Sequence, residues 1–228
     1  MSAPLPHGPE KARAVRRMFD TIAPRYDLVN RVMTFGLDVR WRKRTVASLG
    51  LPAGARILDL ACGTGDLCRE VARAGFVPVG IDFAWGMLAA ARTHAPLVQA
   101  DITRLPVADG AADGITCGFA LRNVVALEAA FAEMARALRP GGRIALLEVA
   151  EPRRSVMRKG HSFYFNRVVP KIGGALSDRE AYSYLPRSVA YLPPSDELLA
   201  TIARAGFTAV ERTLLTAGAA QLITGTRA

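Results

Sequence analysis

The sequence predicts an α/β fold with one doubly wound, seven-stranded sheet, mostly parallel with an antiparallel C-terminal strand. Short apolar runs alternate with stretches of helical periodicity between residues 57 and 149, which is typical of a parallel sheet connected by helices. The chain of 228 residues is 50% hydrophobic and can therefore bury a full core. We expect residues 1–228 to form a single domain.

The N-terminal part and the centre of the chain differ in their patterns. Residues 10–49 carry apolar side chains at helical spacing, so residues 1–49 are assigned as a helical segment. Residues 50–150 are assigned as the core of the sheet. The expected strands lie at 57–60, 77–81, 97–99, 114–119 and 143–149, with helices at 67–74, 85–93 and 127–137. The turn Pro140-Gly141-Gly142 is expected to open the fifth strand.

The alternation of strands and helices stops at residue 151 and resumes at residue 193. Residues 151–192 are basic and rich in aromatic residues, and we expect a helical insertion that covers the substrate side of the sheet. In residues 193–228, Ser195 is the expected N-cap of a helix that ends at Gly206. Strands at 210–214 and 220–226 are expected to complete the sheet.

Positive charge is concentrated outside the central region. The net charge is +10, yet residues 56–148 hold 9 Arg against 10 acidic residues, so the remainder carries a net charge of +11. Such basic flanks indicate an anionic partner, and we expect peripheral contact with an anionic membrane surface at its inner face; a solvated arginine-rich surface is the alternative. The three cysteines, the polar N-terminus and the lack of a long apolar stretch favour a cytoplasmic protein.

A turn of small residues follows the first expected strand. Residues 61–65 read Ala-Cys-Gly-Thr-Gly, and small residues let a ligand approach the backbone beside the positive end of a helix dipole. A dinucleotide-binding turn would read Gly-x-Gly-x-x-Gly, but the third glycine is missing. An NAD-dependent oxidoreductase is therefore an alternative only. The spacing matches the small-x-Gly-x-Gly turn of S-adenosyl-L-methionine (SAM) methyltransferases.

Acidic residues end three of the expected strands. Asp82 lies about 20 residues past the glycine turn, where a ribose hydroxyl would be bound. Asp101 with the Ile102 backbone is placed at the adenine edge, and Asp59 is expected to order the turn or to meet the methionine amine. The residues predicted to bind SAM are Asp59, Ala61, Gly63, Thr64, Gly65, Asp82, Asp101, Ile102 and Gly118.

Several sequence blocks are similar to those of one methyltransferase family. They are Phe-Asp-Thr-Ile-Ala at 19–23, Tyr-Asp-Leu-Val-Asn at 26–30, Thr34, Trp41, Phe-Ala-Leu-Arg-Asn-Val at 119–124, Arg-Pro-Gly-Gly-Arg at 139–143, and Tyr-Ser-Tyr-Leu at 182–185 with Ser188. The chain thus resembles the ubiquinone/menaquinone biosynthesis C-methyltransferases, including demethylmenaquinone methyltransferases. These are class I SAM-dependent enzymes with a Rossmann-like fold.

The resemblance implies C-methylation of a prenylated hydroquinone, such as demethylmenaquinol to menaquinol, with a lipid quinol as the partner. It implies that residues 1–49 form a lid whose Tyr26, Asp27 and Asn30 lie over the pocket. Arg122 and Asn123 are expected to be catalytic. Arg122 would stabilise a developing phenolate or orient a water, and Asn123 would hold that arrangement. The alternative for Arg122 is an ion pair with a nearby acid.

Departures from the family leave other functions open. Asp38, Val29 and Ala150 stand where the family usually has His, Met and Ser. A SAM-dependent methyltransferase of a soluble phenolic or polyketide metabolite and a non-enzymatic SAM-binding subunit are kept as alternatives, and a homodimer is left open. Nucleic acid is not expected as a partner, because the fourth strand lacks the Asn/Asp-Pro-Pro-aromatic motif. No cluster with metal-ligand spacing is found in the sequence, so no metal is expected.

Overall fold

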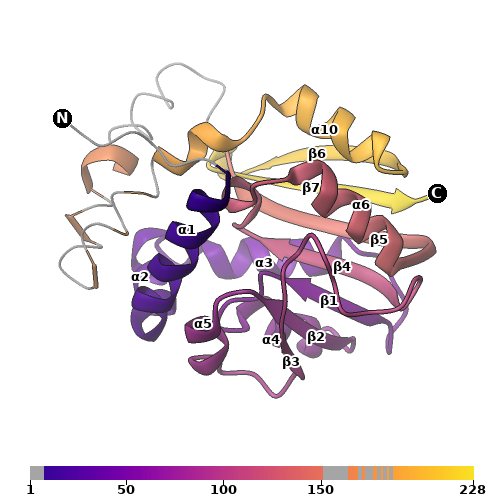
Figure 1. The fold of residues 1–228 in the computed structure, drawn as a ribbon, viewed down its shortest axis with the longest axis horizontal. Coiled ribbons are helices and arrows are strands. Elements are labelled where there is room, and N and C mark those ends of the chain that lie inside the picture. The colour runs from indigo at the N-terminus through magenta and orange to yellow at the C-terminus, as the bar shows by residue number, and fades with distance from the viewer. Residues whose placement is uncertain are drawn as a thin grey trace.

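The computed structural model of the chain describes residues 8–150, 164–168, 171–172, 177–178, 181, 184 and 187–228. Its centre is a seven-stranded sheet with the order β3-β2-β1-β4-β5-β7-β6 (Figure 1). The strands are β1 (Arg56–Leu60), β2 (Val77–Asp82), β3 (Leu97–Gln99), β4 (Ala112–Gly118), β5 (Leu138–Val149), β6 (Phe207–Leu215) and β7 (Ala220–Arg227). β7 pairs antiparallel with β5 and β6, and the pairs among β1 to β5 are parallel. The predicted fold class is confirmed.

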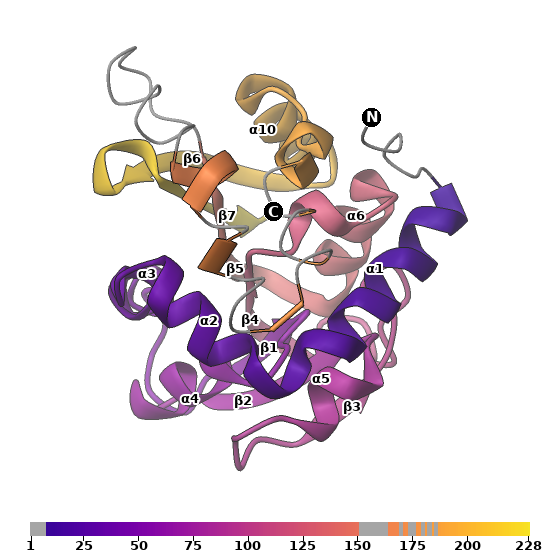
Figure 2. The ribbon, with the colours of Figure 1, turned by 90° about the vertical axis from the view of Figure 1, so that its left-hand side faces the viewer.

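Helices cover both faces of the sheet and the carboxyl ends of its strands. They are α1 (Gly8–Ile22), α2 (Tyr26–Met33), α3 (Leu37–Ala47), α4 (Asp66–Arg73), α5 (Trp85–Ala89), α6 (Leu127–Ala137) and α10 (Ser195–Arg204). Short helical turns are η1 (Ala23–Arg25), η2 (Leu121–Asn123), η3 (Tyr164–Val168), η4 (Val189–Tyr191) and η5 (Thr216–Gly218). α3 and α4 lie on one face, α6 and α10 lie on the other, and α1 and α2 cross in front of the strand ends (Figure 2).

Two apolar clusters hold these layers together. On one face, residues of α3 and α4 pack against β1, β5 and β7, with Trp41, Val46 and Val71 among them. On the other face, Phe131 of α6 and Ile202 of α10 are fully buried against the central strands. Burial of the apolar side chains on both faces explains why the central strands read as continuous apolar runs. The strand order reverses between β1 and β4, and such a point leaves a crevice at the carboxyl ends.

Some element bounds differ from those predicted. α5 ends at Ala89 and not at residue 93, because the Arg92 amide donates to the Thr64 carbonyl at 3.0 Å and draws the chain toward the glycine turn. Ser195 is the first helical residue and not the N-cap. Pro194 occupies the cap position, where its fixed φ of −48° with an extended ψ of 145° ends the preceding segment.

The fifth strand also begins earlier than predicted. β5 starts at Leu138, and Pro140-Gly141-Gly142 lies inside it as an irregularity, since the register with β4 shifts between Ala112 and Gly114. Most of the insertion predicted for residues 151–192 lies outside the described residues. Within the described part of the chain, no helix combines the length and apolar character needed to cross a bilayer.

Candidate functional site

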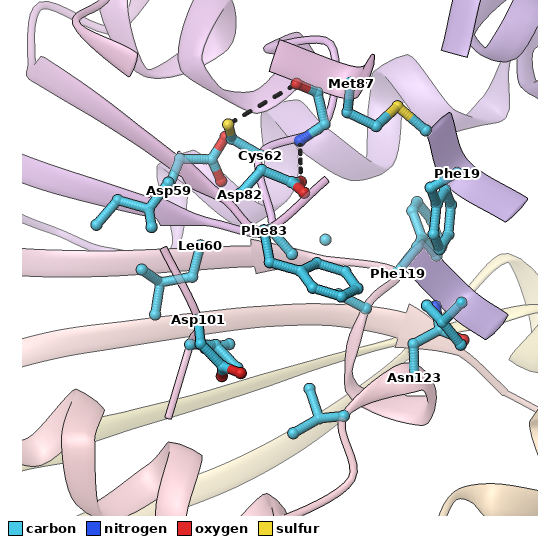
Figure 3. A pocket seen from close by; sticks show the side chains of 18 of the residues that line it. Phe19, Asp59, Leu60, Cys62, Asp82, Phe83, Met87, Asp101, Phe119 and Asn123 are labelled. Atoms are coloured by element: carbon cyan, nitrogen blue, oxygen red, sulfur yellow. Dashed lines mark hydrogen bonds between the residues drawn. The ribbon is translucent and has the colours of Figure 1, made fainter. Parts of the chain in front are cut away.

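One cavity lies at the carboxyl ends of β1, β2 and β4, beneath α1 and α2. Figure 3 shows Asp59, Asp82 and Asp101 along one side of it, with Phe19 and Asn123 on the other. The predicted cofactor residues that line it are Asp59, Ala61, Gly63, Thr64, Asp82, Asp101, Ile102 and Gly118. Of the predicted set, Gly65 is not among the lining residues. The strand ends therefore bring together side chains that are far apart in the sequence.

The glycine turn needs small residues for two different reasons. Gly65 has a φ of 83°, and a Cβ there would approach Cγ2 of Thr93 to 2.7 Å, so a larger residue does not fit. Gly63 has a φ of 56°, and its Cβ would meet only the sulfur of Met87, at 4.0 Å. Both Gly63 and Met87 line the cavity, so the space above Gly63 is open to a ligand. Ala61 also has a positive φ, of 51°.

Asp82 is buried and holds the glycine turn. Its Oδ2 accepts from the Gly63 amide at 2.8 Å, and its Oδ1 accepts from the Ala84 amide at 2.9 Å. A carboxylate offers about four acceptor positions, so both oxygens keep capacity for a pair of hydroxyls. Burial raises the pKa of Asp82 above its ordinary value. This geometry suits the predicted binding of ribose hydroxyls.

Asp59 is fully buried under the turn. Its Oδ1 accepts from the Thr116 hydroxyl at 2.9 Å, and its Oδ2 accepts from the Cys68 thiol at 3.3 Å. Burial raises the pKa of Asp59 to about 7, with a further contribution from the nearby Asp82. These contacts join β1 to β4 and α4, and both roles predicted for Asp59 stay predictions. Because Asp59 also lines the cavity, a cationic ligand there would favour its ionised form.

The third acid lies at the exposed end of the cavity. Oδ1 of Asp101 accepts from the amide and the hydroxyl of Thr103, at 2.8 and 2.7 Å. These bonds fix the loop after β3, and Ile102 within it lines the cavity. Gly118 closes the far wall at the end of β4, where a Cβ would approach Leu67 to 2.8 Å. Leu67 also lines the cavity, so a side chain at position 118 would clash with its wall.

The lid residues occupy three different positions. Tyr26 lines the cavity, and its pKa is raised by burial while Asn30 hydrogen-bonds to its side chain. Asp27 accepts from the hydroxyl of Thr64 and so ties α2 to the glycine turn. Asp27 and Asn30 themselves are not among the lining residues. Of these three, Tyr26 lines the cavity and Asp27 ties α2 to the glycine turn, and their contact with a ligand stays a prediction.

The departure at Asp38 is accommodated by an ion-pair cluster. Asp38 is buried, pairs with Arg42 and accepts from the Thr34 hydroxyl at 2.8 Å. Burial alone would raise the pKa of Asp38, but Arg42 and Thr34 lower it below the ordinary value. Arg42 also pairs with Asp66 at 2.9 Å, and both of these residues line the cavity. The cluster joins α3 to the start of α4.

Arg122 and Asn123 lie on η2 but face different surroundings. Asn123 lines the cavity, and its Oδ1 accepts from the Tyr184 hydroxyl at 3.2 Å. Arg122 is buried behind it and is not among the described lining residues. Its guanidinium pairs with Glu148 at 2.5 Å and donates to the hydroxyl of Ser188 at 3.1 Å. The ion pair considered as an alternative is therefore present, and the catalytic role of Arg122 stays a prediction.

The Arg122 guanidinium also stabilises the turn after β4, which forms part of the cavity wall. It donates to the carbonyl of Phe119 at 2.6 Å, and Phe119 has a φ of 59° in the left-handed region. A bulky residue in that conformation costs free energy, so neighbouring contacts must hold it there. The Phe119 ring packs on Trp41 with centroids 6.1 Å apart. Arg122 and Trp41 together fix the turn after β4.

Two residues at this site carried no recognised signal in the sequence. Glu148 is fully buried and pairs with Arg122, but it follows an apolar run and was not grouped with the other strand-end acids. Lys11 of α1 is buried and donates to the carbonyls of Arg122 and Val124 at 2.9 and 3.3 Å. Its ammonium lies 3.7 Å from the Tyr191 ring centroid, and burial lowers its pKa to about 8. Lys11 thus fastens α1 to η2.

The opposite side of the cavity is apolar. Its lining residues there are Ala12, Val15 and Phe19 of α1, with Phe119, Ala120, Val124, Val125 and Ala126 after β4. A ligand with a polar, hydroxyl-rich part and a flat apolar part would match the two sides. Asn123 stands on the apolar side as a polar group that could orient a ring substituent.

The chain is similar to known proteins along nearly its whole length. The profile of the ubiE/COQ5 methyltransferase family matches residues 8–227. The chain is 44% identical to the demethylmenaquinone methyltransferase of Roseiflexus sp. (strain RS-1), over 97% of this chain and 96% of that protein. It is 40% identical to the ubiquinone/menaquinone biosynthesis C-methyltransferase UbiE of Geobacter sulfurreducens, over 95% of this chain and 89% of that protein.

A solved structure shares the fold at lower identity. It is phosphoethanolamine N-methyltransferase 2 of Haemonchus contortus in complex with S-adenosyl-L-methionine, with a TM-score of 0.61 and 15% identity. The match covers 82% of this chain and 52% of that one. At this identity the likeness supports the fold alone.

Proposed function

The chain belongs to the ubiE/COQ5 methyltransferase family, and from this premise we propose that it transfers the methyl group of SAM to a ring carbon of a prenylated hydroquinone. Conversion of demethylmenaquinol to menaquinol is the reaction proposed first, because the Roseiflexus relative is named a demethylmenaquinone methyltransferase. The observation that carries the proposal is the two-sided cavity, with carboxylates at three strand ends and an apolar wall opposite them.

The polar side fits the cofactor. When bound, SAM supplies a methyl group activated by the positive sulfonium. Asp82 keeps acceptor capacity for ribose hydroxyls, and the open space over Gly63 admits the ligand close to the backbone. We place the adenine between Asp101 and Ile102 on one wall and Gly118 on the other. Thr64 and Asp59 then lie at the methionine end.

The apolar side fits a hydroquinone ring. Phe19, Phe119 and Val124 would exclude water from the ring, and Tyr26 of the lid would lie over it. The chief task of these residues is to align the nucleophilic carbon with the methyl group, because correct alignment alone can supply about 7–11 kcal/mol of the barrier. The prenyl tail would leave along the partly exposed Val125 edge of the cavity.

A hydroquinone carbon becomes a stronger nucleophile when a neighbouring hydroxyl is ionised or polarised. We propose that Asn123 contacts this hydroxyl and that Arg122 acts from behind, through its positive charge and its hold on η2 and Phe119. An arginine is too basic to remove the proton itself. Arg122 is thus a positioning and electrostatic residue in this proposal, and Asn123 is the catalytic residue that touches the substrate.

Methyl transfer to a panel of reduced demethylated quinones tests the proposal. The protein is incubated with labelled SAM and each quinol, and the lipid fraction is analysed by mass spectrometry. We expect a product one methyl group heavier, with the label on a ring carbon. Label in a soluble phenol only would point to the phenolic-metabolite alternative, and tight SAM binding with no transfer to any acceptor would point to a non-enzymatic subunit.

We further propose that the enzyme works at the inner face of a membrane, from the cytoplasm, where a prenylated substrate resides. The basic flanks of the sequence support this, since anionic lipid attracts Lys and Arg within a Debye length. A homodimer stays a prediction.

A further inference from the structure

An apolar stripe faces outward on the lid. Leu28 and Val32 lie at positions i and i+4 of α2 and so share one side of that helix, and Phe35 follows in the turn after it. Their side chains are 57%, 40% and 78% exposed. Large apolar groups exposed singly are ordinary, but two on one side of a short helix with a third in the next turn expose an apolar surface to water at a cost in free energy.

The other side of the same helix reaches the cavity. Tyr26 lines it, and Asp27 accepts from Thr64 of the glycine turn. Val29 is fully buried. The stripe is therefore the outer surface of the element that covers the site, and Figure 2 shows α2 in front of the strand ends. A surface that held this stripe would lie against the outer side of the helix that covers the site.

Charge on the surrounding surface is almost entirely positive. Over α1 to α3, the exposed cationic residues are Arg13, Arg16, Arg17, Arg25, Arg31, Arg40, Lys43 and Arg44. The single exposed acid of residues 8–47 is Glu10, because Asp20, Asp27 and Asp38 are partly or fully buried. An apolar stripe within a basic surface matches the interface of an anionic bilayer, which offers acyl chains beneath negative headgroups.

Phe35 is held in an unfavourable backbone conformation. Its φ is 51°, where Asn or Gly is favoured over a bulky residue, yet its ring is the most exposed of the three. Its ring centroid lies 5.7 Å from that of Tyr164, whose hydroxyl donates to the Met33 carbonyl at 2.8 Å. These contacts hold the Phe35 ring at the surface. The stability of the fold alone would favour Asn or Gly at this position.

We infer that Leu28, Val32 and Phe35 form a membrane-insertion stripe, which enters the interface of an anionic bilayer while the cations of α1 to α3 bind its headgroups. The inference rests on the proposed function in one respect, that the substrate is a lipid. A second copy of the chain is less suited to cover this stripe, because pairing two such surfaces would place their cations close together and the like charges would repel. Nucleic acid could bind the cations, but it would leave the apolar stripe exposed to water.

Binding to vesicles tests the stripe directly. The full chain is sedimented with vesicles of phosphatidylcholine, alone or mixed with phosphatidylglycerol. We expect binding to the anionic vesicles only, weakened by added salt. The double variant Val32→Ser/Phe35→Asn should lose about tenfold or more of the partition coefficient, from the lost burial of two apolar side chains. Asn suits the positive φ at 35, so the variant should keep its melting temperature.

Control variants distinguish insertion of the stripe from nonspecific binding to vesicles. Val77 is 50% exposed at the start of β2, away from the lid, so Val77→Ser makes one of the same changes elsewhere and should leave binding unchanged. Phe35→Trp with brominated lipids should show quenching and a blue shift of the new fluorescence. An equal loss of vesicle binding in Val77→Ser would overturn the inference, and so would a lack of quenching of the Phe35→Trp fluorescence by brominated lipids. A dimer of the chain that dissociates in the double variant, with no change in vesicle binding, would also overturn it.

The two proposals can fail independently. Methyl transfer to a short-tailed, water-soluble demethylated quinol measures the chemistry without a bilayer, and the double variant should retain wild-type turnover there. On a long-tailed quinol in vesicles its rate should fall in step with its binding. Vesicle binding without any methyl transfer would remove the proposed function and leave the stripe, whereas transfer without vesicle binding would remove the stripe alone.

Discussion

At the scale of single residues, the pairing of Arg122 with Glu148 decides how the site is built. Both side chains are buried, and Arg122 reaches Glu148, Phe119 and Ser188 at once. A buried charge that loses its partner is strongly unfavourable, whereas an apolar pair in its place can be nearly neutral. Substitutions at this pair can therefore distinguish its contribution to the stability of the fold from its contribution to catalysis.

Glu148→Leu or Arg122→Leu alone should destabilise the protein by about 3–5 kcal/mol, because each leaves an uncompensated buried charge. The double variant Arg122→Leu/Glu148→Leu should recover most of that loss in urea unfolding. If Arg122 also polarises the substrate hydroxyl, turnover of the double variant stays at least about tenfold below wild type while SAM binding is kept. Recovery of both stability and turnover would leave Arg122 a purely structural role.

Asp59 makes the stability of the protein without cofactor depend on pH. Its pKa is raised from 3.8 to about 7 by burial, so the unfolded chain loses this proton near pH 4 and the folded protein keeps it to about pH 7. The folded state then binds more protons in this window, and stability falls as the pH rises, by on the order of a few kcal/mol in total. Asp82, whose pKa is also raised by burial, adds a decline of the same sign.

Asp59→Asn should flatten this decline between pH 4 and pH 7 in thermal unfolding of the cofactor-free protein. Asp113 provides the control. The Arg56 amide and Arg139 lower its pKa, so its ionised form stabilises the fold above its ordinary pKa of 3.8. This contribution is complete by about pH 5 and is lost only at lower pH, so Asp113→Asn should lower the melting temperature by a nearly constant amount above pH 5 and leave the decline there unchanged. A wild-type melting temperature that does not change with pH over this window would contradict the account of Asp59.

At the scale of elements, sequence periodicity located the strands and missed the contacts between distant segments. The strand 97–99 and the helix 127–137 lie where they were predicted, since local apolar patterning determines both. α5 ends early because Arg92 bonds to Thr64, a partner 28 positions away that no local pattern reveals. The convergence of Asp59, Asp82 and Asp101 was predictable, because the ends of parallel strands meet at one edge.

Lys11 and Glu148 were missed for related reasons. The hydrogen-bond partners of Lys11 are main-chain carbonyls more than 100 positions away, and a lysine in a basic helix gives no hint of them. Glu148 could have been flagged, since it is an acid at the carboxyl end of a buried strand, like Asp59 and Asp82. An acid in an otherwise apolar run is a signal that strand-end reasoning can use in future sequences.

The attachment of α1 depends on Lys11, so Lys11→Met should loosen the lid. We expect faster amide exchange in α1 and a rise of about tenfold in the Michaelis constant for the quinol, because two hydrogen bonds and a cation–π contact are lost at a buried site. Lys43→Met is the matched control, since Lys43 is exposed on α3. Equal effects of the two substitutions would contradict the attachment.

At the scale of the whole molecule, the fold joins a nearly neutral sheet to a basic helical cover. Residues 56–148 hold the acids that face the cavity, and 21 of the 30 Lys and Arg residues lie on the segments outside it. This division follows from what each part contacts, because the sheet binds a small ligand and the cover faces solvent. Fold class could be predicted from the sequence, but the positions of the lid helices relative to the cavity could not, since they depend on contacts such as Asp27 with Thr64.

Ligand binding should stabilise the whole fold. At a concentration about 100-fold above its dissociation constant, SAM should add about 2.7 kcal/mol. For a chain of this size that corresponds to a rise of roughly 5–10 °C in melting temperature. NAD at the same concentration should produce no shift, because the third glycine of its binding turn is absent. A larger shift with NAD than with SAM would contradict the cofactor assignment.

The hydrogen bond from Thr64 to Asp27 has a kinetic consequence. It ties α2 to the glycine turn at the cavity, while Lys11 secures α1 to η2. The spent cofactor can then escape only after these bonds open, so departure of the product should limit the catalytic cycle. Rapid-quench measurements would show this as a burst of one equivalent of methylated lipid, followed by a slower steady rate that Asp27→Ala accelerates.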